Sequence, residues 1–449
     1  MKKIILIICL LFAFGGLYAQ ESGQSYNFSL QQAIDHALQH NYTVINAARD
    51  IDIALQKKRE TTATGLPQIN AGVDYTLNFE IPKSVVPSQF FDPNAAPGEF
   101  TAVEFSPKQS MTARATLSQL LFDGSYIVAL QASKTYLKYY ENAKRKTNTE
   151  VREMVINSYG SVLLAEESIQ ILERNKGILE KTLHDTEETF KNGLIEEENV
   201  EQLKITLSSV NSNLNNARRV AAMAYKMLKV ALGIEIDAQL TLTDKLDNLT
   251  QSNLVNPFSQ NEFSVQGNID YLIAQNFTEQ RSLELKLQKS RALPSLAANL
   301  NFGYNAFDEQ FRFFSSGTKW YNYSFLGATL NVPIFSGFGR AARTQQAKIA
   351  LEQSKTQLVE TEQRLKLAYE NARSQYDFSV EEYATSKSNL ALAERIERKQ
   401  QTKFTEGLST SFDFAEAQRQ LYAAQQSYLQ SMINVITAKA SLENITNAN

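Results

Sequence analysis

The feature that most constrains this chain is a run of 67 residues, 340–406, that contains neither glycine nor proline. Because glycine and proline are the residues that most often end or kink an α-helix, the run predicts one unbroken helix. At about 1.5 Å per residue, that helix would be roughly 100 Å long. Its apolar residues recur every seven positions, with a single four-residue step: Leu351, Leu358, Leu365, Tyr369, Tyr376, Tyr383 and Leu390. Such heptads indicate long helices wound around neighbouring helices rather than a compact globule.

Four shorter segments, bracketed by the nine prolines, alternate instead with a period of two. The clearest are 68–80 and 295–306, whereas 111–122 and 320–335 are less regular. The alternating apolar residues of the two clear segments are Ile69, Ala71, Val73, Tyr75, Leu77 and Phe79, and Leu296, Ala298, Leu300, Phe302, Tyr304 and Ala306. A period of two predicts β-strands, and strands of this length exceed the ~9–11 residues needed to cross a bilayer. One polar and one apolar face suits the wall of a transmembrane β-barrel.

The two halves of the chain repeat one plan. The repeated pieces are Leu66-Pro67 and Leu293-Pro294, residues 121–124 and 334–337, and residues 190–194 and 404–408. Each half therefore reads as a helix, a β-hairpin, a very long helix, a Gly-Leu turn and a shorter helix. The expected segments are N-terminal helices (20–65), a first hairpin (66–123), a long helix with its tip and return helix (124–232), a mixed, Asn-rich segment (233–268), a second-repeat helix (269–292), a second hairpin (293–337) and a second long helix with its tip and return helix (338–449). Ser29, with Gln32 three residues on, predicts a capping box that opens the first helix.

The N-terminal residues 1–19 predict an export signal. Lys2 and Lys3 precede an apolar run that ends at Leu17, and Ala19 offers a cleavage site. The single cysteine, Cys9, lies inside this run, so the mature chain is expected to contain neither a disulfide nor a thiol nucleophile. With 45 basic against 48 acidic side chains, there is no basic excess for binding nucleic acid. No second long apolar segment follows, so entry into a membrane is expected only as strands of a closed barrel.

The number of strands predicts the assembly. Four strands cannot close a barrel, and open strand edges are not tolerated in lipid. Two chains would supply about eight strands, which enclose only side chains, whereas three would supply about twelve and leave a lumen. The expected fold class is therefore mixed: an all-α coiled-coil barrel joined to a transmembrane β-barrel. Each protomer would contribute four strands and four main helical rods in two repeats, closed as a homotrimer of about twelve strands and twelve helices.

Several of these motifs occur together in one known family. They are residues 28–34 (FSLQQAI), residues 120–124 (LLFDG), residues 332–337 (VPIFSG), the two Gly-Leu turns and residues 413–418 (DFAEAQ). In this order the set resembles the TolC-type outer-membrane efflux proteins. The resemblance implies a passive trimeric exit duct that spans the outer membrane and the periplasm, in a tripartite efflux pump or a type I secretion system. The implied partners are a periplasmic adaptor (membrane fusion) protein, an inner-membrane pump and outer-membrane lipid, with no cofactor.

The resemblance also marks two carboxylates, Asp413 and Glu416, as the aperture. Residues three apart share a helix face, and threefold symmetry would stack them as two acidic rings that attract cations. Crowding of six carboxylates would raise their pKa. The alternative is a solvated acid pair that the dipole of the helix N-terminus favours. Residues 196–198, three glutamates at the first-repeat tip, either enlarge the acidic mouth or are simply a solvated helix start.

The two turns at the helix tips, Gly193-Leu194 and Gly407-Leu408, are the expected docking points for the adaptor. Glycine supplies the turn and leucine an exposed apolar knob. Relatives close these tips with a charged lock, but its positions here are Asn199, Phe404 and Ser409, which carry no charge. We therefore expect a closed state to rest on neutral hydrogen bonds and packing, with these three residues as the gate contacts.

No set of residues predicts catalysis, so an enzyme is not expected. His36 and His40 share a helix face, but two imidazoles without a third convergent ligand more often lie on a helix surface, so no metal site is expected. No glycine-rich phosphate loop is present, so energy for export must come from a partner. Two rivals remain: an exported coiled-coil adhesin or envelope scaffold, which the alternating hairpins disfavour, and a secreted enzyme.

Overall fold

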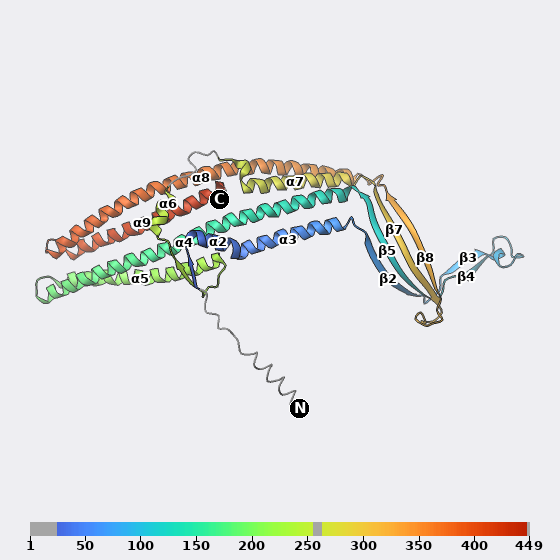
Figure 1. The fold of residues 1–449 in the computed structure, drawn as a ribbon, viewed down its shortest axis with the longest axis horizontal. Coiled ribbons are helices and arrows are strands. Elements are labelled where there is room, and N and C mark those ends of the chain that lie inside the picture. The colour runs from blue at the N-terminus through green and yellow to red at the C-terminus, as the bar shows by residue number, and fades with distance from the viewer. Residues whose placement is uncertain (1–24, 255–262, 447–449) are drawn as a thin grey trace, which may run out of the picture. The chain divides into compact units, whose positions relative to one another are not determined.

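A computed structural model describes residues 25–254 and 263–446 (Figure 1). The expected export signal, residues 1–19, lies outside the described residues. The chain divides into two compact units. The first consists of Met1–Ile51, Tyr140–Ala274 and Leu358–Asn449, and the second of Asp52–Tyr139 and Gln275–Gln357. Among the described residues, no helix combines the length and the apolar character needed to cross a membrane.

The second unit is built on a four-stranded antiparallel sheet. Its strands, in spatial order, are β2 (Gln68–Leu77), β5 (Gln109–Asp123), β7 (Ser295–Asp308) and β8 (Trp320–Asn331). The central pair, β5 and β7, joins the two halves of the chain, with Leu117 opposite Leu300. The four strands lie side by side in Figure 1, where the alternating sequence predicts them.

The strands differ from the expectation in their bounds and by one additional sheet. The first alternating segment, expected over 68–80, ends at Leu77. The loop after β2 contains a separate two-stranded sheet, β3 (Lys83–Pro87) with β4 (Phe100–Glu104), joined through the short 3-10 helix η1 (Ser88–Phe90), and the alternating pattern gave no sign of it. The last segment was expected to continue to residue 335. It ends at Asn331 because Pro333 has no N–H to donate to a neighbouring strand.

Four long helices carry the repeat. Helices α4 (Gly124–Lys191) and α8 (Gly339–Thr405) have 68 and 67 residues, and the return helices α5 (Glu197–Leu232) and α9 (Ser411–Thr446) have 36 each. Along α8 the heptad tyrosines are buried and the heptad leucines half-buried. Two shorter helices, α3 (Tyr42–Ala63) and α7 (Ile269–Ser290), precede the two hairpins.

A small mixed region lies within the first unit. Strand β1 (Ser25–Phe28) pairs in parallel with β6 (Gln239–Leu242), flanked by α2 (Leu30–His40) and α6 (Leu246–Asn253). The predicted capping box is present, because Ser29 Oγ accepts from Gln32 N at 3.4 Å and Gln32 Oε1 accepts from Ser29 N at 2.9 Å.

A buried tyrosine ties this mixed region to α4. The Tyr159 side chain is fully buried, and its hydroxyl is 3.0 Å from Phe28 O and 2.9 Å from Asp244 Oδ2. Asp244 Oδ2 also accepts from Leu30 N at 2.7 Å. Burial, followed by the hydrogen bond to Asp244, raises the pKa of Tyr159.

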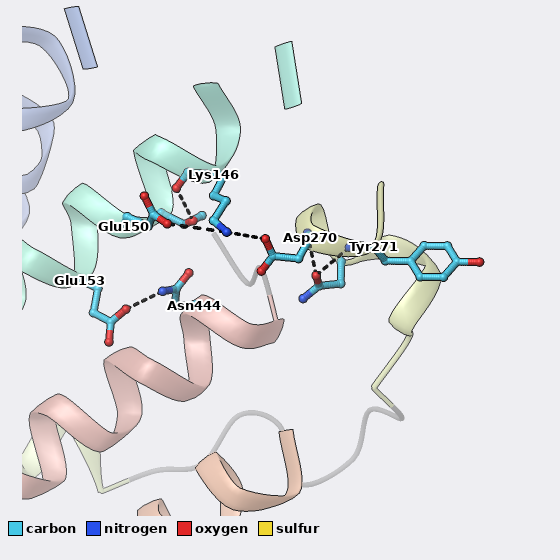
Figure 2. A network of polar contacts seen from close by, with 8 residues as sticks. Lys146, Glu150, Glu153, Asp270, Tyr271 and Asn444 are labelled. Carbon is cyan, nitrogen blue, oxygen red and sulfur yellow. Dashed lines mark hydrogen bonds and ion pairs between the residues drawn. The ribbon is translucent and has the colours of Figure 1, made fainter. Parts of the chain in front are cut away.

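Polar contacts fasten the end of α9 and the start of α7 to α4 (Figure 2). Lys146 Nζ lies 2.6 Å from Asp270 Oδ1 and 3.9 Å from Glu150 Oε1. Asn444 Nδ2 donates to a carboxylate oxygen of Glu153. These contacts join elements from both halves of the chain.

Candidate functional site

The two helix tips, where α4 passes into α5 and α8 into α9, have the same backbone geometry. At the first tip Leu194 N donates to Thr189 O at 3.2 Å and Gly193 N donates to Phe190 O at 2.8 Å. This is the Schellman motif, in which glycine takes the left-handed conformation; Gly193 has φ of 71°.

The second tip repeats the motif. Leu408 N donates to Lys403 O at 2.8 Å, Gly407 N donates to Phe404 O at 3.0 Å, and Gly407 has φ of 72°. Leu194 and Leu408 are 75% and 78% exposed. Each turn therefore presents one leucine to solvent, as the spacing predicts.

The helices after the two turns begin differently. Helix α5 starts after Glu196, whose side chain makes no capping hydrogen bond. At the start of α9, Thr410 Oγ1 accepts from Asp413 N at 3.1 Å, while Asp413 Oδ2 accepts from Thr410 N at 3.3 Å and from Thr410 Oγ1 at 2.8 Å. This reciprocal arrangement is a capping box with an aspartate in place of the usual glutamate.

The two expected aperture carboxylates are both hydrogen-bonded within the chain. Thr410 and then Ser409 donate to Asp413 and lower the pKa of its carboxyl. Gln420 and Arg419 donate to Glu416, at 3.0 Å from Gln420 Nε2 and 2.9 Å from Arg419 Nε, and lower its pKa. Within one chain the pKa is thus lowered, opposite to the effect expected from crowding in a ring. The aperture role itself stays a prediction.

The three neutral positions expected at the gate all make contacts at the tips. Asn199 Oδ1, on α5, accepts from Ser411 N, on α9, at 3.2 Å. The Phe404 ring stacks on Phe414, with centroids 5.5 Å apart and planes 8° apart. Ser409 Oγ donates to Asp413 Oδ2 at 3.2 Å. Asn199 therefore links the two tips of one chain through a neutral hydrogen bond.

The tips share a small apolar core that the sequence analysis did not single out. Leu179 of α4, Leu203 and Val210 of α5 and Phe414 of α9 are buried together. Phe414 is fully buried and lies between the two expected aperture carboxylates in sequence. One turn of α9 therefore contributes both a core side chain and the two acidic side chains. In the sequence, only its position next to Asp413 points to a role for Phe414 at the tip.

A buried carboxyl lies further along the same helix pair. Glu397 of α8 is only 9% exposed, and burial raises its pKa, against a hydrogen bond from Gln418. The pKa of Tyr422, on α9, is also raised. Burial of its hydroxyl is the larger cause, and the nearby charge of Glu397 is the smaller one. Sequence reasoning missed this cluster because a glutamate on a heptad helix normally lies on its solvated face.

A groove of about 940 Å³ lies between α4, α5 and α9. Its wall on α5 includes Val220, Met223 and Met227, which are 52%, 60% and 64% exposed. Asn175 Nδ2 of α4 donates to Gln425 Oε1 of α9 at 2.9 Å at the same groove. A single chain thus leaves an apolar helix face uncovered.

Among the described residues, no group of three or more His, Cys, Asp or Glu side chains could hold a metal ion. The His36 and His40 rings stack, with centroids 4.1 Å apart, and His40 Nδ1 lies 3.0 Å from His36 O. Burial, and then the nearby His40, lowers the pKa of His36.

Comparison with known proteins gives consistent matches. The sequence model of the family described as outer membrane efflux protein matches residues 33–234 and 274–448. Outer membrane protein TolC of Vibrio cholerae serotype O1 is 21% identical over 410 residues, which cover 89% of this chain and 86% of that protein. The solved structure of CusC has a TM-score of 0.73 at 17% identity, covering 96% of this chain and 95% of that chain. VceC from Vibrio cholerae gives 0.69 at 16% identity, covering 93% and 95%.

Proposed function

Because the chain belongs to the outer membrane efflux protein family, we propose that three copies form one passive exit duct of a tripartite efflux pump or a type I secretion system. Members of this family are outer-membrane channels that extend into the periplasm, and that is where this chain acts in efflux. The family consists of channel proteins, so the adhesin, scaffold and enzyme alternatives lose their support.

The observation that carries the proposal is the sheet with two open edges. Within the described residues, β2 and β8 each pair with only one neighbouring strand of that sheet. An unpaired edge exposes backbone N–H and C=O groups, which lipid cannot hydrogen-bond. Edges β2 and β8 of neighbouring copies would satisfy each other. Three copies give about twelve strands, enough to enclose a lumen.

The helices support the same arrangement. The exposed apolar residues of α5 follow heptad-like spacing: Val220, Met223, Met227 and Val230, at 50% to 64% exposure. Isolated exposed apolar residues are normal, but a stripe at this spacing is typical of a helix that packs on another helix. In the proposed duct a neighbouring copy covers it.

The tips are proposed as the adaptor-docking points. Leu194 and Leu408 are exposed on turns that share the Schellman motif, so both repeats offer a similar apolar contact. Three copies would present six such contacts in a ring, which suits a partner protein with repeated hairpin tips.

Asp413 and Glu416 are proposed to line the aperture. Within one chain, hydrogen bonds lower the pKa of both carboxyls below the usual value, which favours their ionised form. Up to six negative charges around one axis would attract a divalent cation or a polyamine and disfavour anions.

Mass photometry of the detergent-purified protein tests the assembly. The proposal predicts particles of three chains, and single-channel recording of the same sample in a planar bilayer should show cation preference. A uniform monomer or dimer without conductance would refute the duct.

A further inference from the structure

The two repeats differ where the last strand of each hairpin passes into a long helix. In the first repeat β5 ends at Asp123 and α4 begins at the next residue, Gly124. In the second, β8 ends at Asn331 and α8 begins only at Gly339. We call the intervening residues 332–338 the junction loop.

The junction loop ends in a strained turn. Gly337 and Phe338 have φ of 56° and 62°, and Gly339 N donates to Ser336 O at 3.1 Å, the pattern of a type I′ turn. Phe338 is the single non-glycine residue with positive φ in the described part of the chain. A bulky side chain in this conformation is an outlier, and outliers of this kind cluster at functional sites.

Arg340 holds the junction loop in place. Its Nη1 donates to Pro333 O at 2.8 Å, Nη2 to Ile334 O at 3.1 Å and Nε to Ser336 Oγ at 3.1 Å. The loop is thus fixed, and the three apolar side chains it presents stay outside: Ile334, Phe335 and Phe338 are 89%, 75% and 77% exposed.

The first repeat carries apolar side chains at its own passage from strand to helix. Leu121 and Phe122 are the repeat equivalents of Ile334 and Phe335, and they lie at the end of β5, beyond Ser118, the last residue of β5 that pairs with β2. They are 56% and 42% exposed within one chain. The repeat places Ser125, the second residue of α4, where Phe338 lies, so Phe338 is a ring that the first repeat lacks.

A cavity of about 430 Å³ lies beside the junction loop, between the end of α7 and the start of α8. Phe335 and Phe338 form one side, Ala341 of α8 another, and Lys289 and Arg340 contribute the charges. No carboxylate lines the cavity among the described residues.

In the first repeat the corresponding space is filled. Tyr126, the third residue of α4, packs against Gly65, and its hydroxyl donates to Thr62 O at 3.2 Å. The sequence repeat places Gly339 where Tyr126 lies, and the third residue of α8 is Ala341, so neither position carries a ring. Counted back from the repeated Leu-Pro pair, Lys289 takes the place of Thr62. The second repeat therefore has an open cavity lined by cations, whereas in the first repeat the Tyr126 ring occupies the corresponding place.

The charges of the cavity are available to a ligand. Lys289 forms no ion pair within the part of the chain that the structure describes, and an exposed ammonium carries three donors. Arg340 directs three of the five N–H groups of a guanidinium to the loop, which leaves the remainder free to meet an anion. An anionic group joined to an apolar tail matches both the cations and the exposed rings.

We propose that this cavity binds the phosphate of an anionic membrane phospholipid, with Ile334, Phe335 and Phe338 seated at the start of its acyl chains. The inference rests on the proposed function, which puts the sheet in the outer membrane and the helices in the periplasm. The junction loop then lies at the bilayer interface, where aromatic rings and snorkelling cations are favoured. A free phosphate ion would use the cations but leave the three apolar side chains in water.

Native mass spectrometry of the full-length assembly tests the proposal. Detergent-purified protein is mixed with dioleoyl phosphatidylglycerol or dioleoyl phosphatidylcholine, and the retained lipid is counted. Wild type should retain phosphatidylglycerol preferentially. Lys289→Gln should weaken that retention about fivefold, the effect of one cation near an anionic surface.

Three further variants separate the site from general effects. Ala341→Tyr places a ring at the third residue of α8, the position that Tyr126 takes in α4, and should lower phosphatidylglycerol retention as Lys289→Gln does. Phe338→Gly relieves the strained turn and yet should also lower retention. Lys286→Gln removes the same charge one turn earlier on α7 and should change nothing.

Equal retention of the two lipids by wild type, or unchanged retention in Lys289→Gln, overturns the proposal. Displacement of the lipid by millimolar inorganic phosphate would overturn it as well, since the site would then recognise the ion alone. The same spectra give the assembly mass. A trimer without lipid preference refutes only the lipid site, whereas a monomer refutes the proposed function.

Discussion

Replacing Leu194 and Leu408 by aspartate is expected to abolish export and leave assembly unchanged. The two leucines are 75% and 78% exposed in the described chain, so they contribute little to its own core. Full burial of a leucine is worth about 1.5–3 kcal/mol, so covering the remaining exposed area in a docked complex would contribute about 1–2 kcal/mol per side chain.

Three chains would present six of these leucines, so the docked ring would gain on the order of 10 kcal/mol. Aspartate removes this gain and adds the cost of burying an unpaired carboxylate. Even a tenth of that loss, about 1 kcal/mol, would weaken binding about fivefold. The double variant should therefore fail to hold an adaptor.

The assay compares export and assembly in a deletion strain that carries each variant. Accumulation of an exported compound should rise to the level of the deletion, while mass photometry of the purified variant should still give the wild-type particle mass. The matched control is Leu194→Met with Leu408→Met, which keeps the apolar volume and should export normally. Normal export by the aspartate double variant would mean that the turns are only helix stops.

Three further predictions follow from the first unit. Asp413→Asn with Glu416→Gln should remove cation preference and block by divalent cations in single-channel recordings. In wild type the block should persist to about pH 5, because the pKa of both groups is lowered. Block that disappears between pH 7 and 5 would instead favour a pKa raised by crowding of the carboxylates. Glu397→Gln should raise the thermal midpoint at pH 7.5, by an amount equivalent to about 1 kcal/mol, because the buried ionised carboxyl destabilises the fold there. Because folding raises the pKa of Glu397, wild-type stability should fall as the pH rises from the ordinary pKa of a carboxyl through the raised pKa. Equal thermal midpoints of wild type and variant at pH 7.5 would contradict this. Tyr159→Phe should cost about 1–3 kcal/mol in thermal unfolding, because it removes the one buried O–H that Phe28 O and the Asp244 carboxylate share. An unchanged midpoint would refute that role.

Periodic features of this chain could be predicted from sequence because each depends on the local spacing of apolar residues. The heptad tyrosines Tyr376 and Tyr383 are buried along α8, and the alternating segments are strands of one sheet. The Schellman turns follow from glycine alone, since few other residues tolerate their positive φ.

Contacts between distant residues could not be predicted in the same way. Nothing local indicates that Asn199 accepts from Ser411 N, 212 positions away, or that Glu397 is buried beside Gln418. The lowered pKa of Asp413 within one chain could not be predicted either, because nothing in the sequence shows that Thr410 and Ser409 donate hydrogen bonds to its carboxyl. The cavity beside Phe338 could not be predicted either, because it results from the absence of a ring that the first repeat has in Tyr126.

The most direct test of the trimeric duct is a disulfide between the open edges of the sheet. The repeat predicts the register: Leu117 lies opposite Leu300, and their repeat equivalents are Leu330 on β8 and Val73 on β2. The one native cysteine, Cys9, lies in the expected export signal, so Val73→Cys with Leu330→Cys introduces the only pair. Side chains of neighbouring strand residues point to opposite faces, which makes Val73→Cys with Thr329→Cys the matched control.

Under oxidation, the Val73→Cys and Leu330→Cys variant should give a ladder on denaturing gels that stops at three chains, while the control stays monomeric. A ladder that ends at two chains, continues beyond three, or never forms would contradict a closed ring of three.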